Sequence, residues 1–226
     1  MTTPQDLLFV ALDVPADRPV EQGDLSLALA AAELLDLLVA QVVTLRDEQV
    51  VPVSGHLTGD PMLDKAAASL IRTEPYESAE DWLWRRGDGL SAAYRDELEH
   101  TGPSGSGLRQ LFRRADRSVD RIDSEARRHA ADRWARHEPL LVGLAAALGI
   151  EDPDHEETAT TAEHAEHAEH AEHAENAEND TADTDKVDDR VAVVLAALGE
   201  ALTELEAVRQ RRRIEEDAFD NVWRAP

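Results

Sequence analysis

The stretch LSLALAAAELLDLLVAQVV, residues 25–43, decides the fold that the rest of the chain is built around. It is the longest apolar run in the sequence, yet Glu33 and Asp36 lie near its middle. Each such charge at the centre of a bilayer would cost about 2.5 kcal/mol or more on insertion scales. We therefore interpret the run as a core helix of a soluble domain and not as a membrane span. The apolar residues 7–12 near the start are too few, and lack the basic flank, for a signal peptide.

The residues that follow the apolar run predict a small β-hairpin and then a series of helices. Residues 41–45 and 49–53 are rich in β-branched side chains, and the three polar residues between them suit a turn. Pro52 cannot donate a ladder hydrogen bond, so it indicates an edge strand. Amphipathic spacing then predicts helices over residues 61–71, 78–87, 90–99, 117–138, 140–150 and 191–208.

Two of these helices carry clear start signals. Asp60 precedes Pro61, which places an N-cap carboxylate before a proline at the first helical position. Ser78 opens a sequence that resembles a capping box in front of Trp82, and Gly87 can end that short helix. Trp82 is interpreted as a core residue and not as a membrane anchor. The chain is therefore predicted to be mainly α, a single helical domain with a small β-hairpin.

The acidic charge of the chain is concentrated in one segment. The 226 residues carry 48 Asp and Glu against 23 Lys and Arg, a formal net charge of −25. Residues 151–190 hold sixteen acidic residues and two basic ones, so −14 of that charge lies there. Such a segment cannot bury enough apolar surface to offset its ordering entropy. We predict a disordered acidic insert over 151–187, a folded domain over 1–150 and 188–214, and a C-terminal tail over 215–226.

Composition excludes several classes of function. Nucleic-acid binding needs clustered cations, which the overall charge disfavours. The chain has no cysteine, hence no disulfide framework or thiolate site, and a cytoplasmic location is expected. No phosphate-cradling glycine loop or nucleophile elbow occurs, so the protein is predicted not to be an enzyme and to use no cofactor.

The acidic insert contains a histidine repeat. Residues 162–173 repeat the triplet Ala-Glu-His four times. Imidazoles three residues apart can bind zinc or nickel, whereas the alternative is a solvated repeat whose histidines are incidental. Because three-residue steps rotate around a helix, the four histidines cannot converge on one ion, and no metal site is predicted.

Arginine clusters offer two alternative interpretations. Residues 107–138 hold nine Arg against six acidic residues, and a second cluster lies at 209–213. Either cluster can form an anion site for a phosphate headgroup or an acidic partner protein. The alternative is a solvated helix face with intrahelical ion pairs. Arg85 and Arg86, beside Trp84, form a smaller candidate of the same kind.

The order of the segments resembles the Golgi phosphoprotein 3 family, in its bacterial, actinobacterial-like branch. The resemblance covers about residues 5–150 and 188–210. It rests on the Leu-rich opening after Asp6, the helix with Ala32-Glu33-Leu34, the hairpin, Gly59-Asp60-Pro61-Met62-Leu63-Asp64, and Glu80-Asp81-Trp82-Leu83. The resemblance implies a helical domain that binds phosphatidylinositol 4-phosphate in a basic, Trp-containing pocket as a peripheral membrane adaptor. A projecting hairpin supports oligomers in the family, and residues 102–107 here form a shorter Gly/Ser loop.

The family's pocket arginines do not transfer to this sequence. Their positions fall near Leu27, Asp88 and Ser91, and the pocket Trp falls near Arg18. The expected ligand-binding residues are instead the nearest available set: Trp84, Arg85, Arg86 and Arg95. The expected function is phosphoinositide or other phospholipid headgroup binding at a membrane surface. The alternative is a cytoplasmic protein-interaction domain that uses its Arg-rich helix, without lipid binding.

Overall fold

The computed structural model confirms a mainly helical fold with one two-stranded hairpin. It describes residues 1–16, 19–53, 55, 57–101, 124–151 and 178–223. In these ranges the elements follow the order α1 (Thr3–Asp13), α2 (Gln22–Val39), β1 (Val43–Arg46), β2 (Gln49–Pro52), α3 (Pro61–Ala68), α4 (Ala79–Gly87), α5 (Leu90–Thr101), α6 (Ser124–Ala135), α7 (Pro139–Ala147) and α9 (Glu178–Trp223).

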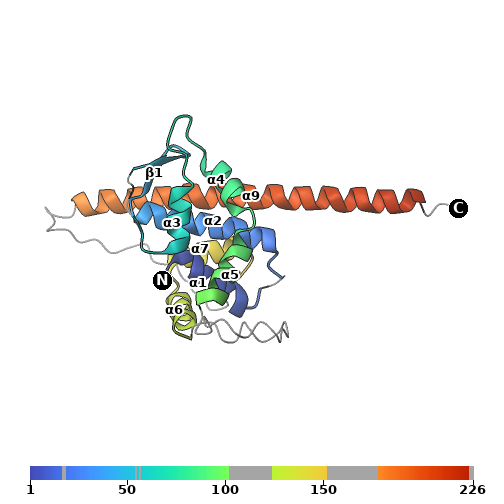
Figure 1. The fold of residues 1–226 in the computed structure, drawn as a ribbon, viewed down its shortest axis with the longest axis horizontal. Helices are drawn as coiled ribbons and strands as arrows, with labels where there is room; N and C mark the ends of the chain where they lie inside the picture. Colours follow the sequence, from blue (N-terminus) through green and yellow to red (C-terminus); the bar gives the residue numbers. More distant parts are fainter. Residues whose placement is uncertain (17–18, 54, 56, 102–123, 152–177, 224–226) are drawn as a thin grey trace, which may run out of the picture.

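Helix α2 is the centre of the molecule, and the other helices pack around it (Figure 1). Its side chains are buried on every face, from Leu25 to Leu38, which is why its sequence reads as a continuous apolar run. Helices α1, α4, α5, α7 and α9 all contact it. The predicted core helix is therefore confirmed. Among the described residues, no helix is both long and apolar enough to cross a membrane.

Helix α2 ends four residues before the apolar run does. Gln41 adopts a left-handed conformation with φ 55°. Its N–H donates to the carbonyl of Leu38, and the next N–H, of Val42, donates to the carbonyl of Leu37. These two bonds form a Schellman motif. Gln41 occupies the position where glycine is usual, so the sequence carried no stop signal there.

The hairpin lies where it was predicted. Strands β1 and β2 are antiparallel, with Val43 opposite Pro52 and Arg46 opposite Gln49. The outer edge of β2 is partly covered, because the Val50 N–H donates to Glu77 and the Ala79 N–H donates to Glu48. Those bonds tie the hairpin to the start of α4.

The predicted helix starts at α3 and α4 are confirmed. The Asp60 carboxylate accepts hydrogen bonds from the N–H groups of Met62 at 2.9 Å and Leu63 at 3.0 Å. The Ser78 hydroxyl accepts one from the Asp81 N–H at 3.0 Å. Asp64 in turn accepts from the Thr58 N–H at 2.7 Å. The acidic residues of the Gly59–Asp64 run thus have a structural role in the turn before α3.

Helix α9 differs from its prediction at both ends. It begins at Glu178, within the predicted insert, and continues through the predicted C-terminal tail to Trp223. Residues 178–187 and 215–223 are therefore helical, and neither segment contains a proline or glycine to interrupt the helix. The rest of the predicted insert, including the Ala-Glu-His triplets, lies outside the described residues.

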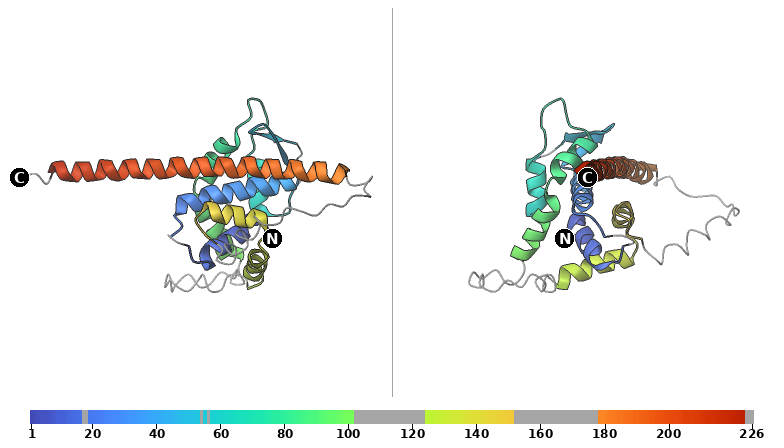
Figure 2. Two further views of the ribbon diagram at one scale, coloured as in Figure 1. Left: turned by 180° about the vertical axis from the view of Figure 1, so that it is seen from behind. Right: turned by 90° about the vertical axis from the view of Figure 1, so that its right-hand side faces the viewer.

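Helix α6 lies across the outer side of α1 (Figure 2). It covers Ser124–Ala135, the C-terminal part of the helix predicted over 117–138. Ala126 and Ala130 pack against Phe9 of α1 in a small separate apolar cluster. Residues 102–123, with the Gly/Ser loop and five arginines of the first cluster, lie outside the described ranges.

Candidate functional site

Three helices converge on a pocket beside Trp84, which we call the Trp84 pocket. Its volume is about 650 Å³. Helix α2 contributes its N-terminal turn, α4 contributes its C-terminal end and the turn that follows, and α9 contributes one leucine. The lining residues are Gln22, Gly23, Ser26, Leu27, Trp84, Arg85, Gly87, Asp88, Gly89 and Leu205.

Two glycines allow the helices to come this close. A Cβ atom on Gly87 would lie 3.3 Å from the backbone oxygen of Ser26. A Cβ atom on Gly23 would lie 2.9 Å from the Arg209 guanidinium and 3.1 Å from the Leu205 side chain. These distances are tighter than ordinary contacts. A larger residue at position 87 would press on the backbone of α2, whereas at position 23 the side chains of Arg209 and Leu205 would have to move.

Arg85 presents one edge of its guanidinium to a carboxylate, and the residue also lines the pocket. Its Nε and Nη2 atoms donate to Glu77 at 2.9 and 2.6 Å. The guanidinium also lies 5.2 Å from the ring centroid of Trp82, within cation–π range. The Arg85 side chain is 40% exposed, and its Nη1 atom has no hydrogen bond to another described residue. The predicted pair Trp84 and Arg85 thus lines one cavity.

Arg86 belongs to the core and does not line the Trp84 pocket. Its Nε and Nη2 atoms donate to Glu33 at 2.7 and 2.9 Å, and the Tyr94 hydroxyl donates to the same carboxylate at 2.9 Å. Glu33 is fully buried, and Trp82 and Tyr94 are almost fully buried. Burial raises the pKa of Glu33 above its usual value, although the bonds from Arg86 oppose that shift. Arg86, one of the predicted ligand-binding residues, thus makes a structural contact with Glu33 and is not in the lining of the Trp84 pocket.

Arg95 lies apart from this pocket. It is an exposed residue on α5 and does not line the Trp84 pocket. Arg95 was predicted because it is close to Arg85 and Arg86 in sequence. The pocket lining ends at Gly89, just before α5 begins, and Arg95 lies further along α5. The structure therefore brings together two of the four predicted residues.

The positions that correspond to the family's arginines do meet at the Trp84 pocket. Leu27 and Asp88 line it, and the Ser91 N–H donates to Ser26, which also lines it, at 3.1 Å. Leu27 and Asp88 are not cations, so the family's arginines have no counterparts in this lining. Sequence patterns did not indicate that Gln22, Gly23 and Leu205 line this pocket, because the contact of α9 with α2 joins residues about 180 positions apart.

The charges around the Trp84 pocket are mostly paired. Arg209 lies just beyond Gly23, where it donates to Asp24 at 2.8 Å and pairs with Glu21 at 2.9 Å. Asp88 adds a carboxylate to the wall itself. A strongly anionic ligand therefore gains little from long-range attraction here and depends on direct hydrogen bonds.

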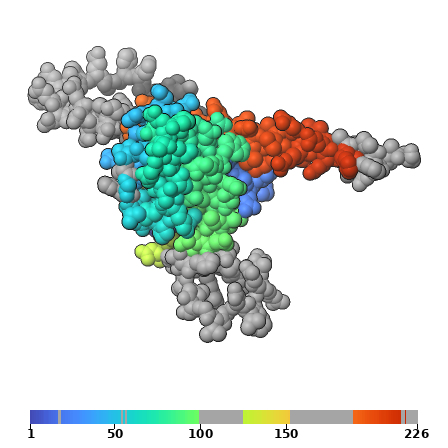
Figure 3. Space-filling view, turned by 45° about the horizontal axis from the view of Figure 1, so that its top comes forward, coloured from blue at the N-terminus to red at the C-terminus, as the bar shows by residue number. Residues whose placement is uncertain are grey.

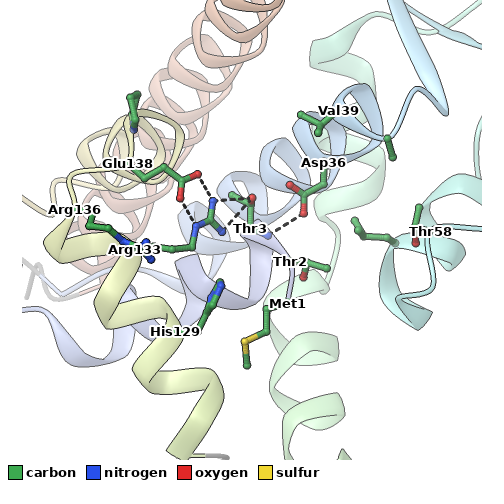
Figure 4. A pocket seen from close by; sticks show the side chains of 13 residues that line it. Met1, Thr2, Thr3, Asp36, Val39, Thr58, His129, Arg133, Arg136 and Glu138 are labelled. Atoms are coloured by element: carbon green, nitrogen blue, oxygen red, sulfur yellow. Dashed lines mark hydrogen bonds and ion pairs between the residues drawn. The ribbon is translucent and has the colours of Figure 1, made fainter.

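A second cavity, of about 790 Å³, lies between the start of α1, the end of α2 and the α6–α7 junction (Figure 4). Arg133 crosses its wall, donating to Asp6 at 2.6 Å and pairing closely with Glu138. The Thr3 N–H donates to the Asp36 carboxylate at 2.8 Å. The guanidinium is thus shared between two carboxylates, which leaves little capacity for an incoming anion.

Asp36 should make folding stability depend on pH. Burial raises its pKa above the usual value for aspartate, against the opposing hydrogen bonds from Thr3. A carboxyl group with a raised pKa in the folded state holds its proton more tightly than in the unfolded chain. Its contribution is therefore most favourable at low pH and is lost as the pH rises through the folded pKa.

Asp36→Asn should remove this dependence while keeping an oxygen that accepts from Thr3. We expect the free energy of unfolding of the variant, relative to the wild type, to increase between about pH 4 and about pH 7. Urea unfolding at a series of pH values measures the difference. A constant difference across that range would show that Asp36 titrates as it does in the unfolded chain.

Several arginines of the Arg-rich helix α6 form ion pairs or hydrogen bonds within the protein. Arg127 of α6 donates to Asp13 at 2.5 and 2.7 Å, and Arg133 is held by Asp6 and Glu138. Arg136 donates to the backbone oxygen of Asp132 in its own helix. Three described arginines of the first cluster therefore have partners within the fold. Arg127 and Arg133 pair with carboxylates outside α6, which differs from the intrahelical ion pairs of the alternative interpretation.

One family comparison gives a match to this chain. The sequence model of the family described as Golgi phosphoprotein 3 (GPP34) matches residues 4–205, most of the chain. The chain belongs to the Golgi phosphoprotein 3 family. The predicted family is thereby confirmed. No curated protein and no solved structure matches the chain.

Membership in the Golgi phosphoprotein 3 family does not by itself identify the ligand of this chain. The matched range includes the whole Trp84 pocket, from Gln22 to Leu205. It ends before the last turns of α9, so residues 206–223 are an extension beyond the family match.

Proposed function

We propose that this protein is a non-enzymatic, peripheral phospholipid-headgroup-binding member of its family, with phosphatidylinositol 4-phosphate as the ligand. The observation that carries the proposal is the meeting of Trp84, Arg85 and the N-terminal turn of α2 around one cavity of about 650 Å³. Family membership supports an adaptor role at a membrane surface, in contact with the cytoplasm.

Each part of the cavity suits one part of a phosphorylated sugar headgroup. The first N–H groups of α2 have no partner inside the helix, and Glu21 does not cap them with its side chain. Such a helix start favours a phosphate. The outer edge of Arg85 can donate to the same phosphate, while Glu77 holds the inner edge in place. The half-buried ring of Trp84 gives the sugar an apolar surface to lie on.

The proposal can be tested by vesicle co-flotation with matched arginine variants. We expect binding to vesicles with phosphatidylinositol 4-phosphate to exceed binding to neutral vesicles, and to fall with salt. Arg85→Ala should weaken it about tenfold, the effect of losing one charged hydrogen bond. Arg95→Ala removes the same charge from an exposed site outside the pocket and should bind like the wild type. Asp88→Asn should strengthen binding, because it removes a carboxylate from the wall.

Three results would contradict the proposal. Equal recovery with neutral vesicles would remove lipid recognition altogether. Equal recovery with phosphatidylserine vesicles of the same charge would remove headgroup selectivity. Equal losses for Arg85→Ala and Arg95→Ala would show that the Trp84 pocket is not the site. In the first case, the alternative of a protein-interaction domain becomes the better hypothesis.

A further inference from the structure

The C-terminal part of α9 extends away from the body as a single helix (Figures 1 and 3). We call residues 206–223 the arm. The last contact of α9 with the body that we identify is Arg209, paired with Glu21 and Asp24 of α2. Beyond it, Ile214 and Phe219 are 68% and 64% exposed. Most helical stability in proteins comes from tertiary packing of an apolar face, and these exposed apolar side chains do not supply such packing with the body.

The face of α9 that contacts the body continues along the arm with a coiled-coil spacing. Val194, Leu198 and Ala201 are fully buried and alternate by four and three residues. The same alternation leads through Leu205 to Val208, Arg212, Glu215 and Phe219. These are successive a and d positions of a heptad repeat. Arg212, Glu215 and Phe219 line one shallow hollow on the arm, so they share a face.

Two copies of this face are complementary when the helices run antiparallel, because oppositely charged residues then lie opposite one another. In an antiparallel pair of helices, an a residue of one faces a d residue of the other. With the two-fold axis between residues 213 and 214, Arg212 faces the second copy's Glu215, and Val208 faces the second copy's Phe219. Two-fold symmetry repeats both layers, which gives four layers, two charged and two apolar. A parallel pair would instead place like charges opposite one another.

The charged residues of this face are available for a partner. Within the described part of the chain, neither Arg212 nor Glu215 forms an ion pair or hydrogen bond with another side chain. By contrast, the neighbouring Arg213 is paired with Glu206 of its own helix at 3.1 Å. Polar a and d layers of this kind select register and orientation in coiled coils.

We propose that the arm forms an antiparallel two-stranded coiled coil with a second copy of this chain. The overlap of residues 208–219 spans about 18 Å at the rise of an α-helix. It joins two bodies at opposite ends of a short rod. This dimer is independent of the proposed lipid ligand, because its seam uses neither Trp84 nor Arg85 and Arg95, the two arginines of the lipid test.

A charge-swap series in the full-length chain tests the dimer. The wild type should show a concentration-dependent monomer–dimer equilibrium in sedimentation equilibrium. Arg212→Glu places two acidic pairs in the seam, and Glu215→Arg places two basic pairs there. Each should weaken the dimer about tenfold or more, the effect of replacing attractive pairs by repulsive ones. The double variant Arg212→Glu/Glu215→Arg restores both pairs and should dimerise like the wild type.

A mixture of the two single variants should form a heterodimer, because each carries the charge that the other lacks. Arg213→Glu is the matched control: it makes the same charge change beside the seam and should leave the dimer intact. Circular dichroism checks that every variant keeps its helix content. A wild-type chain that is monomeric at every concentration overturns the proposal. So does a dimer that Arg212→Glu leaves unchanged, or a double variant that remains as weak as the single ones.

Discussion

Arg86→Ala is expected to lower the free energy of unfolding by about 3–5 kcal/mol. Arg86 makes two hydrogen bonds to Glu33, which is fully buried in α2. Removing the guanidinium leaves that carboxylate in the core with only the Tyr94 hydroxyl as a donor. A buried charge without its partner is far more costly than the loss of an exposed ion pair. Chemical denaturation monitored by tryptophan fluorescence measures the change.

The reason for this loss can be checked by pH and by a control. Burial already raises the pKa of Glu33, so without Arg86 the group should take up a proton more readily. The deficit of Arg86→Ala should therefore shrink as the pH falls. Arg95→Ala, on the exposed side of α5, should change stability by less than about 0.5 kcal/mol. Similar losses for the two variants would contradict the structural role assigned to Arg86.

Arg133→Ala is expected to lower the free energy of unfolding by about 3–5 kcal/mol and to loosen α6. Arg133 joins α6 to Asp6 of α1, which is fully buried, and to Glu138 at the start of α7. Glu138 has its pKa lowered chiefly by the hydrogen bond from Arg133. Its favourable contribution is present above the usual glutamate pKa and is lost as the pH falls through the folded pKa.

Hydrogen exchange locates this effect, because amides of α6 should lose protection before those of α2. Arg136→Ala is the matched control, since Arg136 is an exposed residue of the same region that donates only to the backbone of Asp132. Unchanged protection of α6 in Arg133→Ala would show that the apolar contact of Phe9 with Ala126 and Ala130 holds the helix by itself.

The sequence predicted the local structure where a single residue type decides it. Asp60 before Pro61, and Ser78 three residues before Asp81, predicted helix starts that the structure confirms. The charges within the apolar run predicted a soluble core helix, and the structure shows the reason. Glu33 forms an ion pair with Arg86, and Asp36 accepts a hydrogen bond from the Thr3 N–H at the start of α1.

Local sequence signals do not settle the structure where tertiary contacts decide it. Gln41 ends α2 in a left-handed conformation that sequence would assign to glycine. Arg85 and Arg86 are neighbours with identical chemistry, yet the helix turns one toward the Trp84 pocket and the other toward Glu33. A step of about 100° per residue is enough to separate a candidate ligand-binding residue from a core residue.

If a phospholipid headgroup occupies the Trp84 pocket, it lies against the Trp84 ring. The NMR signal of the Trp84 indole N–H therefore reports on occupancy of the pocket directly. A titration of the ¹⁵N-labelled chain with short-chain phosphatidylinositol 4-phosphate should shift that signal in a saturable way. Trp84→Phe assigns it. The signal of Trp82, whose indole N–H is buried and donates to the Ala30 carbonyl at 3.2 Å, should remain in place. Lipid binding without a shift of the Trp84 signal would show that the headgroup does not occupy the Trp84 pocket. An absence of any lipid binding would contradict the proposed function itself.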